Sequence, residues 1–61
     1  MTRRDYVAIA AAINRATINM MARNTPRSEC AVMAEYVADV MARDNPHFDR
    51  ERFLKACGVQ S

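Results

Sequence analysis

Two prolines divide this chain into three segments, and each segment favours a helix. The 61 residues include only one glycine and are rich in alanine, methionine and arginine, which have high helix propensity. No alternating apolar and polar run is long enough for a strand. Proline disfavours a helical conformation in the residue before it, so Pro26 and Pro46 mark breaks. The sequence predicts an all-α fold, with a helical hairpin at about 3–23 and 26–43 and a short third helix at about 50–57.

The first segment is apolar on two sides. One stripe comprises Tyr6, Ile9, Ile13, Ala16 and Met20, and a second comprises Val7, Ala11, Ile18 and Met21. A helix that is apolar over more than half of its circumference needs cover on two sides. A single domain of residues 1–61 buries only ~60% of its unfolded surface, so we expect a helical oligomer. The residues predicted for self-association or partner binding are Tyr6, Ile9, Ile13, Ile18, Met20 and Met21.

The second segment has its own start signal. Thr25 suits the N-cap, Pro26 the first helical position, and Glu29 adds negative charge near the helix start. The predicted apolar face of this helix comprises Cys30, Met33, Val37, Val40 and Met41.

Four local signals agree on the third helix. Asp49 is a good N-cap, and Phe48 and Phe53 are spaced for a hydrophobic staple. Gly58 suits the left-handed position after a helix, where a Schellman closure brings Val59 back against the last turn. The residues predicted to have structural roles here are Pro46, Phe48, Asp49, Phe53, Leu54 and Gly58.

The ending "VADVMARDNPHFDRERFLKACGV" resembles that of a family of short uncharacterised phage and prophage proteins with the pattern NPxFDRxRFLxACG. The opening "MTRRDYVAIAAAI" is similar to the start of the same family. His47 departs from the pattern, because arginine is more usual there. The resemblance implies a phage or prophage origin in a bacterial host, and it implies no activity, catalytic residue or ligand.

The cysteines and the opening residues indicate the compartment. Asn14 and Arg15 interrupt the first apolar run, so we expect neither a secretion signal nor a membrane span. Two cysteines do not make a disulfide scaffold, and we expect reduced core thiols in the cytoplasm. Cys30, His47 and Cys57 match no zinc spacing, so no metal or other cofactor is predicted.

Catalytic equipment is sparse. The chain has one histidine, no glycine-rich loop, and a cysteine, Cys57, at a helix C-terminus, where the dipole opposes a thiolate. We therefore expect no enzymatic activity.

Charge is unevenly distributed. Residues 1–27 carry five arginines and one aspartate (+4), residues 28–49 one arginine and five carboxylates (−4), and residues 50–61 three basic residues and one glutamate (+2). The first two blocks can pair with each other, within one chain or between two. The alternative is nucleic-acid binding, in which the third helix would enter a groove or the N-terminus would contact phosphates. Its candidate residues are Arg3, Arg4, Arg15, Arg50, Arg52 and Lys55.

The sequence therefore favours a small helical protein that acts through protein contacts as a homodimer. Its expected partners are a second copy of itself and an unidentified host or phage protein that it binds or modulates, with inhibition of a host defence as a special case. Nucleic acid is the less favoured partner.

Overall fold

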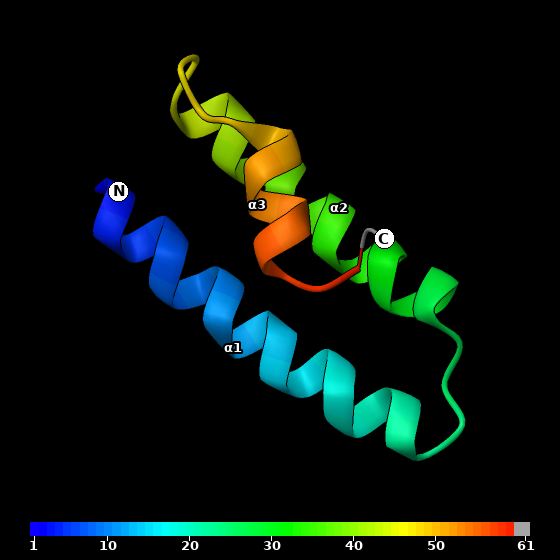
Figure 1. The fold of residues 1–61 in the computed structure, drawn as a ribbon. Coiled ribbons are helices and arrows are strands. Elements are labelled where there is room, and N and C mark those ends of the chain that lie inside the picture. The colour runs from blue at the N-terminus through cyan, green and yellow to red at the C-terminus, as the bar shows by residue number, and fades with distance from the viewer. Residues whose placement is uncertain (60–61) are drawn as a thin grey trace.

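The computed structural model describes residues 1–59, which form three helices (Figure 1). They are α1 (Arg3–Ala22), α2 (Arg27–Asp44) and α3 (Arg50–Ala56). The two long helices form a hairpin, and α3 contacts both of them at the end away from the hairpin turn. The all-α prediction is confirmed, and each predicted helix end lies within one residue of the observed one.

Helix α1 begins at a capping box. The Asp5 N–H donates to Thr2 Oγ1 at 3.4 Å, and the Thr2 N–H donates to Asp5 Oδ2 at 2.9 Å. The two bonds satisfy backbone donors that the first turn of a helix leaves without partners.

Helix α1 ends in a complete Schellman closure. Asn24 adopts a left-handed conformation with φ of 70°. Its N–H donates to the Met21 carbonyl at 3.1 Å, and the Thr25 N–H donates to the Met20 carbonyl at 2.9 Å. Asparagine tolerates this conformation better than most residues.

That closure explains an error in the sequence prediction for α2. Thr25 is not its N-cap; Pro26 is, and Pro26 makes no side-chain capping bond. Because the Thr25 backbone closes α1, the helix that follows begins one residue later than expected.

Helix α3 confirms the predicted local signals. The Asp49 side chain accepts a hydrogen bond from the Arg52 N–H at 3.1 Å, and the rings of Phe48 and Phe53 lie 5.4 Å apart. Gly58 has φ of 78°, and its N–H donates to the Lys55 carbonyl at 3.0 Å, one of the two bonds of a Schellman closure.

The core lies where the three helices meet. Its buried apolar residues are Ala10, Cys30, Ala34, Ala38, Met41, Phe53, Leu54, Cys57 and Val59. The predicted inner face of α2 was partly wrong, because Met33 and Val40 are exposed while Ala34 and Ala38 are fully buried. Alanine at these two positions lets neighbouring helices approach α2 closely, and a larger side chain would hold them apart.

Candidate functional site

A groove of about 340 Å³ separates the first half of α1 from α3 and the loop before it. The residues that line it are Arg3, Tyr6, Val7, Ala10, Asn45, His47, Phe48, Asp49, Arg52, Phe53 and Ala56. Most of these side chains are apolar, and the charged ones come from both sides of the groove. The groove therefore joins an apolar surface to charged groups from segments far apart in the sequence.

Three aromatic rings form one continuous contact beside this groove. The rings of Tyr6 and Phe48 lie 5.0 Å apart at a tilt of 58°, and Phe48 in turn contacts Phe53. Such tilted pairs contribute about 0.5–1.5 kcal/mol beyond the area they bury. The Tyr6 hydroxyl is buried and has no hydrogen-bond partner within residues 1–59. A phenol left in this state destabilises a fold by about 1–3 kcal/mol.

Two arginines contribute positive charge to the groove. Arg3 from α1 and Arg52 from α3 are both exposed, and neither forms an ion pair with any residue that the structure describes. Asp49 also lines the groove. Its carboxylate accepts a hydrogen bond from the Arg52 backbone N–H and so caps α3.

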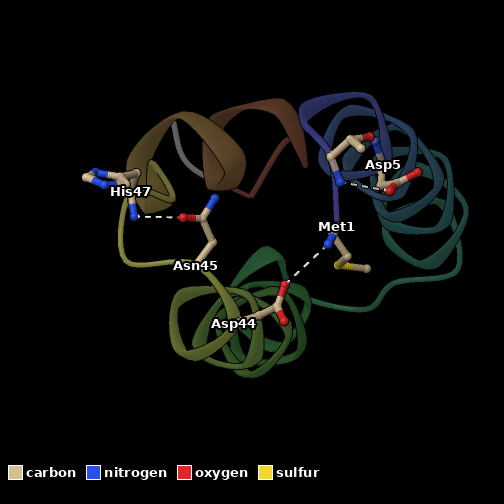
Figure 2. A network of polar contacts seen from close by, with 6 residues as sticks. Met1, Asp5, Asp44, Asn45 and His47 are labelled. Carbon is tan, nitrogen blue, oxygen red and sulfur yellow. Dashed lines mark hydrogen bonds and ion pairs between the residues drawn. The ribbon is translucent and has the colours of Figure 1, made fainter.

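His47 lies in the loop at one end of the groove. Its N–H donates to Asn45 Oδ1 at 3.0 Å, and its ring points away from the helices (Figure 2). The side chain is exposed, which agrees with a loop residue in contact with water.

The same end of the molecule holds the N-terminus. Its amino group lies 3.5 Å from Asp44 Oδ2, joining the start of α1 to the end of α2 (Figure 2). Both groups are about half exposed, so this ion pair contributes only about 0–1 kcal/mol.

The six residues predicted for nucleic-acid binding fall into two groups. Arg3, Arg4 and Arg15 on α1 and Arg52 and Lys55 on α3 are exposed. Arg50 instead forms an ion pair with Asp39 and donates from Nη2 to the Glu35 carbonyl at 3.4 Å. Arg50 therefore connects α3 to α2. No ion pair joins the arginines of α1 to the carboxylates of α2 within the described residues.

The six residues predicted for self-association also divide. Tyr6, Ile9, Ile13, Met20 and Met21 are half-buried and pack against the core of their own chain. Ile18 is 64% exposed. The three helices therefore cover most of the first stripe of α1, whereas Val7 and Ile18 of the second stripe are exposed.

Sequence reasoning missed a larger apolar surface on α2. We call it the outer face of α2, and it comprises Val32, Met33, Tyr36 and Val40, which are 50%, 49%, 70% and 61% exposed. The signal in the sequence was an excess of apolar residues, which occur on more sides of α2 than one core contact can cover.

Sequence reasoning also missed a polar contact that fixes α3. Asn14, on α1, donates from Nδ2 to the Ala56 carbonyl at 3.1 Å. A carbonyl in the last turn of α3 thereby gains a partner from another helix. A lone asparagine in an apolar run was the available signal.

The cysteines belong to the core. Cys30 and Cys57 are both buried and unbonded. Burial raises the pKa of Cys57 from 9.0 to about 11, which disfavours a thiolate nucleophile there. Among residues 1–59, no three histidine, cysteine or acidic side chains come together as a metal site would require.

Comparison with known proteins gave no matching family model, no similar curated protein and no similar solved structure. None of the helices in the described part of the chain combines the length and apolar character needed to cross a bilayer.

Proposed function

We propose that this chain is a small accessory protein of phage or prophage type that acts through protein contacts. It works as a homodimer in the cytoplasm of a bacterial host and binds a host or phage protein, which it modulates without chemistry of its own. Inhibition of a host defence is one form that this modulation can take. The resemblance of the ending and opening to small phage proteins supports the setting.

The observation that carries the proposal is the groove between α1 and α3. Its apolar surface is open, and two arginines without ion-pair partners among the described residues lie along it. Its volume of about 340 Å³ suits one or two large side chains. Arginine and aromatic residues are enriched in protein interfaces, where they contribute strongly to affinity.

The chemistry of the groove defines the partner. A segment that fits it carries an aromatic or aliphatic side chain next to one or more carboxylates. The apolar side chain would enter the groove beside Tyr6 and Phe48, and a carboxylate would pair with Arg3 or Arg52. We therefore propose an acidic segment of the target protein as the occupant.

A peptide selection tests this proposal directly. Random peptides selected on the immobilised protein are expected to share an aromatic or aliphatic residue beside Asp or Glu. The variant Arg3→Glu/Arg52→Glu is expected to lose these peptides, whereas Arg15→Glu, which reverses an exposed charge outside the groove, should keep them. Peptides with no such pattern, or equal binding by both variants, would overturn the assignment of the groove.

The Tyr6 hydroxyl offers a second test. Tyr6→Phe removes a buried donor that has no described partner, so the free protein should be as stable as the wild type or more stable. If the bound segment supplies an acceptor to this hydroxyl, the same change weakens peptide binding. Stability by chemical denaturation and affinity by calorimetry separate the two effects.

Capture from a host lysate identifies the natural partner. The lysate is treated with nuclease, and the bound proteins are compared between wild type, Arg3→Glu/Arg52→Glu and Arg15→Glu. A partner that depends on the groove is recovered with the first and third proteins only.

One observation favours the second candidate, nucleic-acid binding. Arg3 and Arg52 line the same groove although they are distant in sequence, and Arg4 and Arg15 are exposed on α1. The ion pair of Arg50 with Asp39 reduces the charge that α3 offers to phosphates. Because Arg50 also connects two helices, the test variant is Arg3→Ala/Arg52→Ala/Lys55→Ala.

Binding to phosphates would give a DNA mobility shift that weakens steeply as salt increases and is lost in this triple variant. The absence of a shift with the wild-type protein at low salt would exclude this second function.

A further inference from the structure

Among the described residues, α2 exposes more large apolar side chains than α1, and the four of the outer face are all among them. Its four residues lie within about 60° of Tyr36 around the helix axis, at 100° per residue. The buried residues Cys30, Ala34, Ala38 and Met41 lie on the opposite side of the helix. The helices of this chain therefore leave the outer face uncovered.

Opposite charges flank this face at equal distances. Glu29 lies seven residues before Tyr36, and Arg43 lies seven residues after it. Both side chains are exposed, and neither forms an ion pair with any residue from 1 to 59. Both also lie within the same angular sector as the apolar residues.

The two valines of the outer face repeat this symmetry, whereas the counterpart of Met33 is Asp39. Val32 precedes Tyr36 by four residues and Val40 follows it by four. A surface with this pattern is complementary to a copy of itself turned through 180°. A parallel arrangement would instead bring glutamate against glutamate and arginine against arginine.

We propose that the outer faces of two α2 helices pair antiparallel, about a two-fold axis beside Tyr36. Val32 of each copy then contacts Val40 of the other, the two Tyr36 rings meet at the axis, and Glu29 pairs with Arg43 at both ends. Such an interface is isologous, as expected for a two-fold homodimer. This inference rests on the homodimer in the proposed function and assigns its surface and orientation.

Glu29 and Arg43 also have a simpler role within a single helix, which must be distinguished from pairing between two copies. Glu29 in the first turn and Arg43 in the last turn both complement the dipole of α2 itself. That role stabilises one helix but requires no second copy and no apolar residues between the charges. A charge-swap experiment distinguishes the two roles.

The experiment measures the solution mass of Glu29→Arg and of Arg43→Glu, separately and mixed. In an antiparallel homodimer each variant brings like charges together at both ends, so its dissociation constant should rise at least tenfold. In an equimolar mixture, each copy of one variant meets opposite charges on the other. The mixture should therefore regain the mass of a dimer, and the double variant Glu29→Arg/Arg43→Glu should do so alone.

Helix content by circular dichroism accompanies each measurement. Both single changes oppose the dipole of α2, but mixing leaves that effect unaltered. Recovery of mass on mixing can therefore come only from contacts between copies. Single variants that dissociate and do not reassociate on mixing would overturn the antiparallel arrangement.

A pair of apolar changes locates the interface independently. Tyr36→Lys should give a monomer, whereas Ile18→Lys, at a similarly exposed residue of α1, should leave the dimer intact. The reverse result would assign the interface to α1 and overturn the inference.

The outcomes also separate this inference from the proposed function. A wild-type protein that stays a monomer at every concentration overturns the homodimer and its α2 interface together, while binding of acidic peptides to the groove stays open to its own test. A wild-type dimer whose mass is unchanged by the single charge variants and by Tyr36→Lys retains the homodimer and overturns the α2 interface.

Discussion

The two sides of α2 reverse the usual relation between residue size and burial. The inner side consists mainly of small residues, Ala34, Ala38 and Cys30, which are almost completely buried. The outer face carries larger apolar residues, including Tyr36 and Val40, which are largely exposed. Small side chains are buried here because they permit close helix contacts. The larger ones are left over once those contacts are made.

The largest expected effect compares two methionines on these two sides. Met41 is 2% exposed and Met33 is 49% exposed. Met41→Ala should lower the free energy of unfolding by about 2–5 kcal/mol, because it opens a cavity among residues that cannot close it fully. Met33→Ala should lower it by less than about 1 kcal/mol. Urea denaturation of both variants checks the contrast.

The protein concentration must be varied in that measurement. If α2 forms a homodimer, Met33→Ala will also lower stability at concentrations where the wild type is dimeric. If Met41→Ala and Met33→Ala lowered the free energy of unfolding equally at low protein concentration, the difference in burial between the two residues would be contradicted.

A comparison of two alanines tests the close packing on the inner side. Ala38 is fully buried, whereas Ala42, one turn later, is exposed. Ala38→Leu should lower the free energy of unfolding by about 1–3 kcal/mol, since the added atoms have no space. Ala42→Leu adds the same atoms facing water and should change stability by less than about 0.5 kcal/mol. Similar stability of the two variants would mean that α2 is rotated about its axis.

Local signals in the sequence predicted the local structure well. Asp49, the Phe48–Phe53 contact and the left-handed Gly58 depend on neighbours within a few residues, and all were predicted. The complete closure of α1 depended on Asn24, whose left-handed conformation is less common than that of glycine, so Thr25 was assigned to the wrong helix.

The contacts between segments could not be predicted in the same way. Apolar residues on α2 outnumber the positions that face the core, and periodicity alone favours the larger ones. The groove requires that Arg3 and Arg52, far apart in sequence, lie along one surface. That arrangement depends on how α3 crosses the hairpin, which helix periodicity does not specify.

A substitution in the turn after α3 is expected to have the next largest effect on the free energy of unfolding. It returns Val59 to the core, and Gly58 has a positive φ that a branched residue rarely adopts. A Cβ at this position would also lie 3.3 Å from Asn14 Oδ1. Gly58→Val should therefore lower the free energy of unfolding by about 1–3 kcal/mol.

The matched position is the end of α1. Asn24 has the same left-handed conformation, so Asn24→Gly should leave stability unchanged or raise it slightly. Thermal unfolding of both variants is sufficient. Unchanged stability in Gly58→Val would contradict our account of the ending.

Substitution of Thr2 and of Thr25 compares the segments that precede the two long helices. Thr2→Ala removes the side-chain cap of α1 and should lower the free energy of unfolding by about 1 kcal/mol. Thr25→Ala should have a smaller effect, because its backbone, not its side chain, closes the turn. A larger loss for Thr25→Ala would instead indicate that the Thr25 side chain caps α2.

The capping box also predicts a dependence on pH. The hydrogen bonds from the Thr2 backbone and side chain lower the pKa of Asp5 below its usual 3.8. The stabilisation by Asp5 is therefore complete above the unfolded pKa, and is lost as pH falls through the lower folded value. Asp5→Asn should reduce the loss of stability between about pH 5 and pH 2, measured against wild type.

The core and the outer face of α2 should also differ in thiol reactivity, with Cys30 of α2 and Cys57 at the end of α3 as the core thiols. Cys30 and Cys57 are buried, so both should react slowly with iodoacetamide in the folded protein and rapidly after denaturation. Burial raises the pKa of Cys57 from 9.0 to about 11, and the neutral thiol is favoured in the folded state. Its contribution to stability is complete below pH 9 and is lost as pH rises toward 11.

The variant Tyr36→Cys places a thiol on the outer face of α2, for comparison with the two buried cysteines. In a monomer, Tyr36→Cys should react at the rate of an exposed thiol, because the outer face of α2 is open to solvent. If two copies pair through this face, the reaction should slow as protein concentration increases, while the rates at Cys30 and Cys57 stay unchanged. Mass spectrometry of the alkylated chain separates the three sites. Fast reaction of Cys30 and Cys57 in the folded protein would show that the core opens readily. The buried and exposed sides of α2 would then not differ in solvent access.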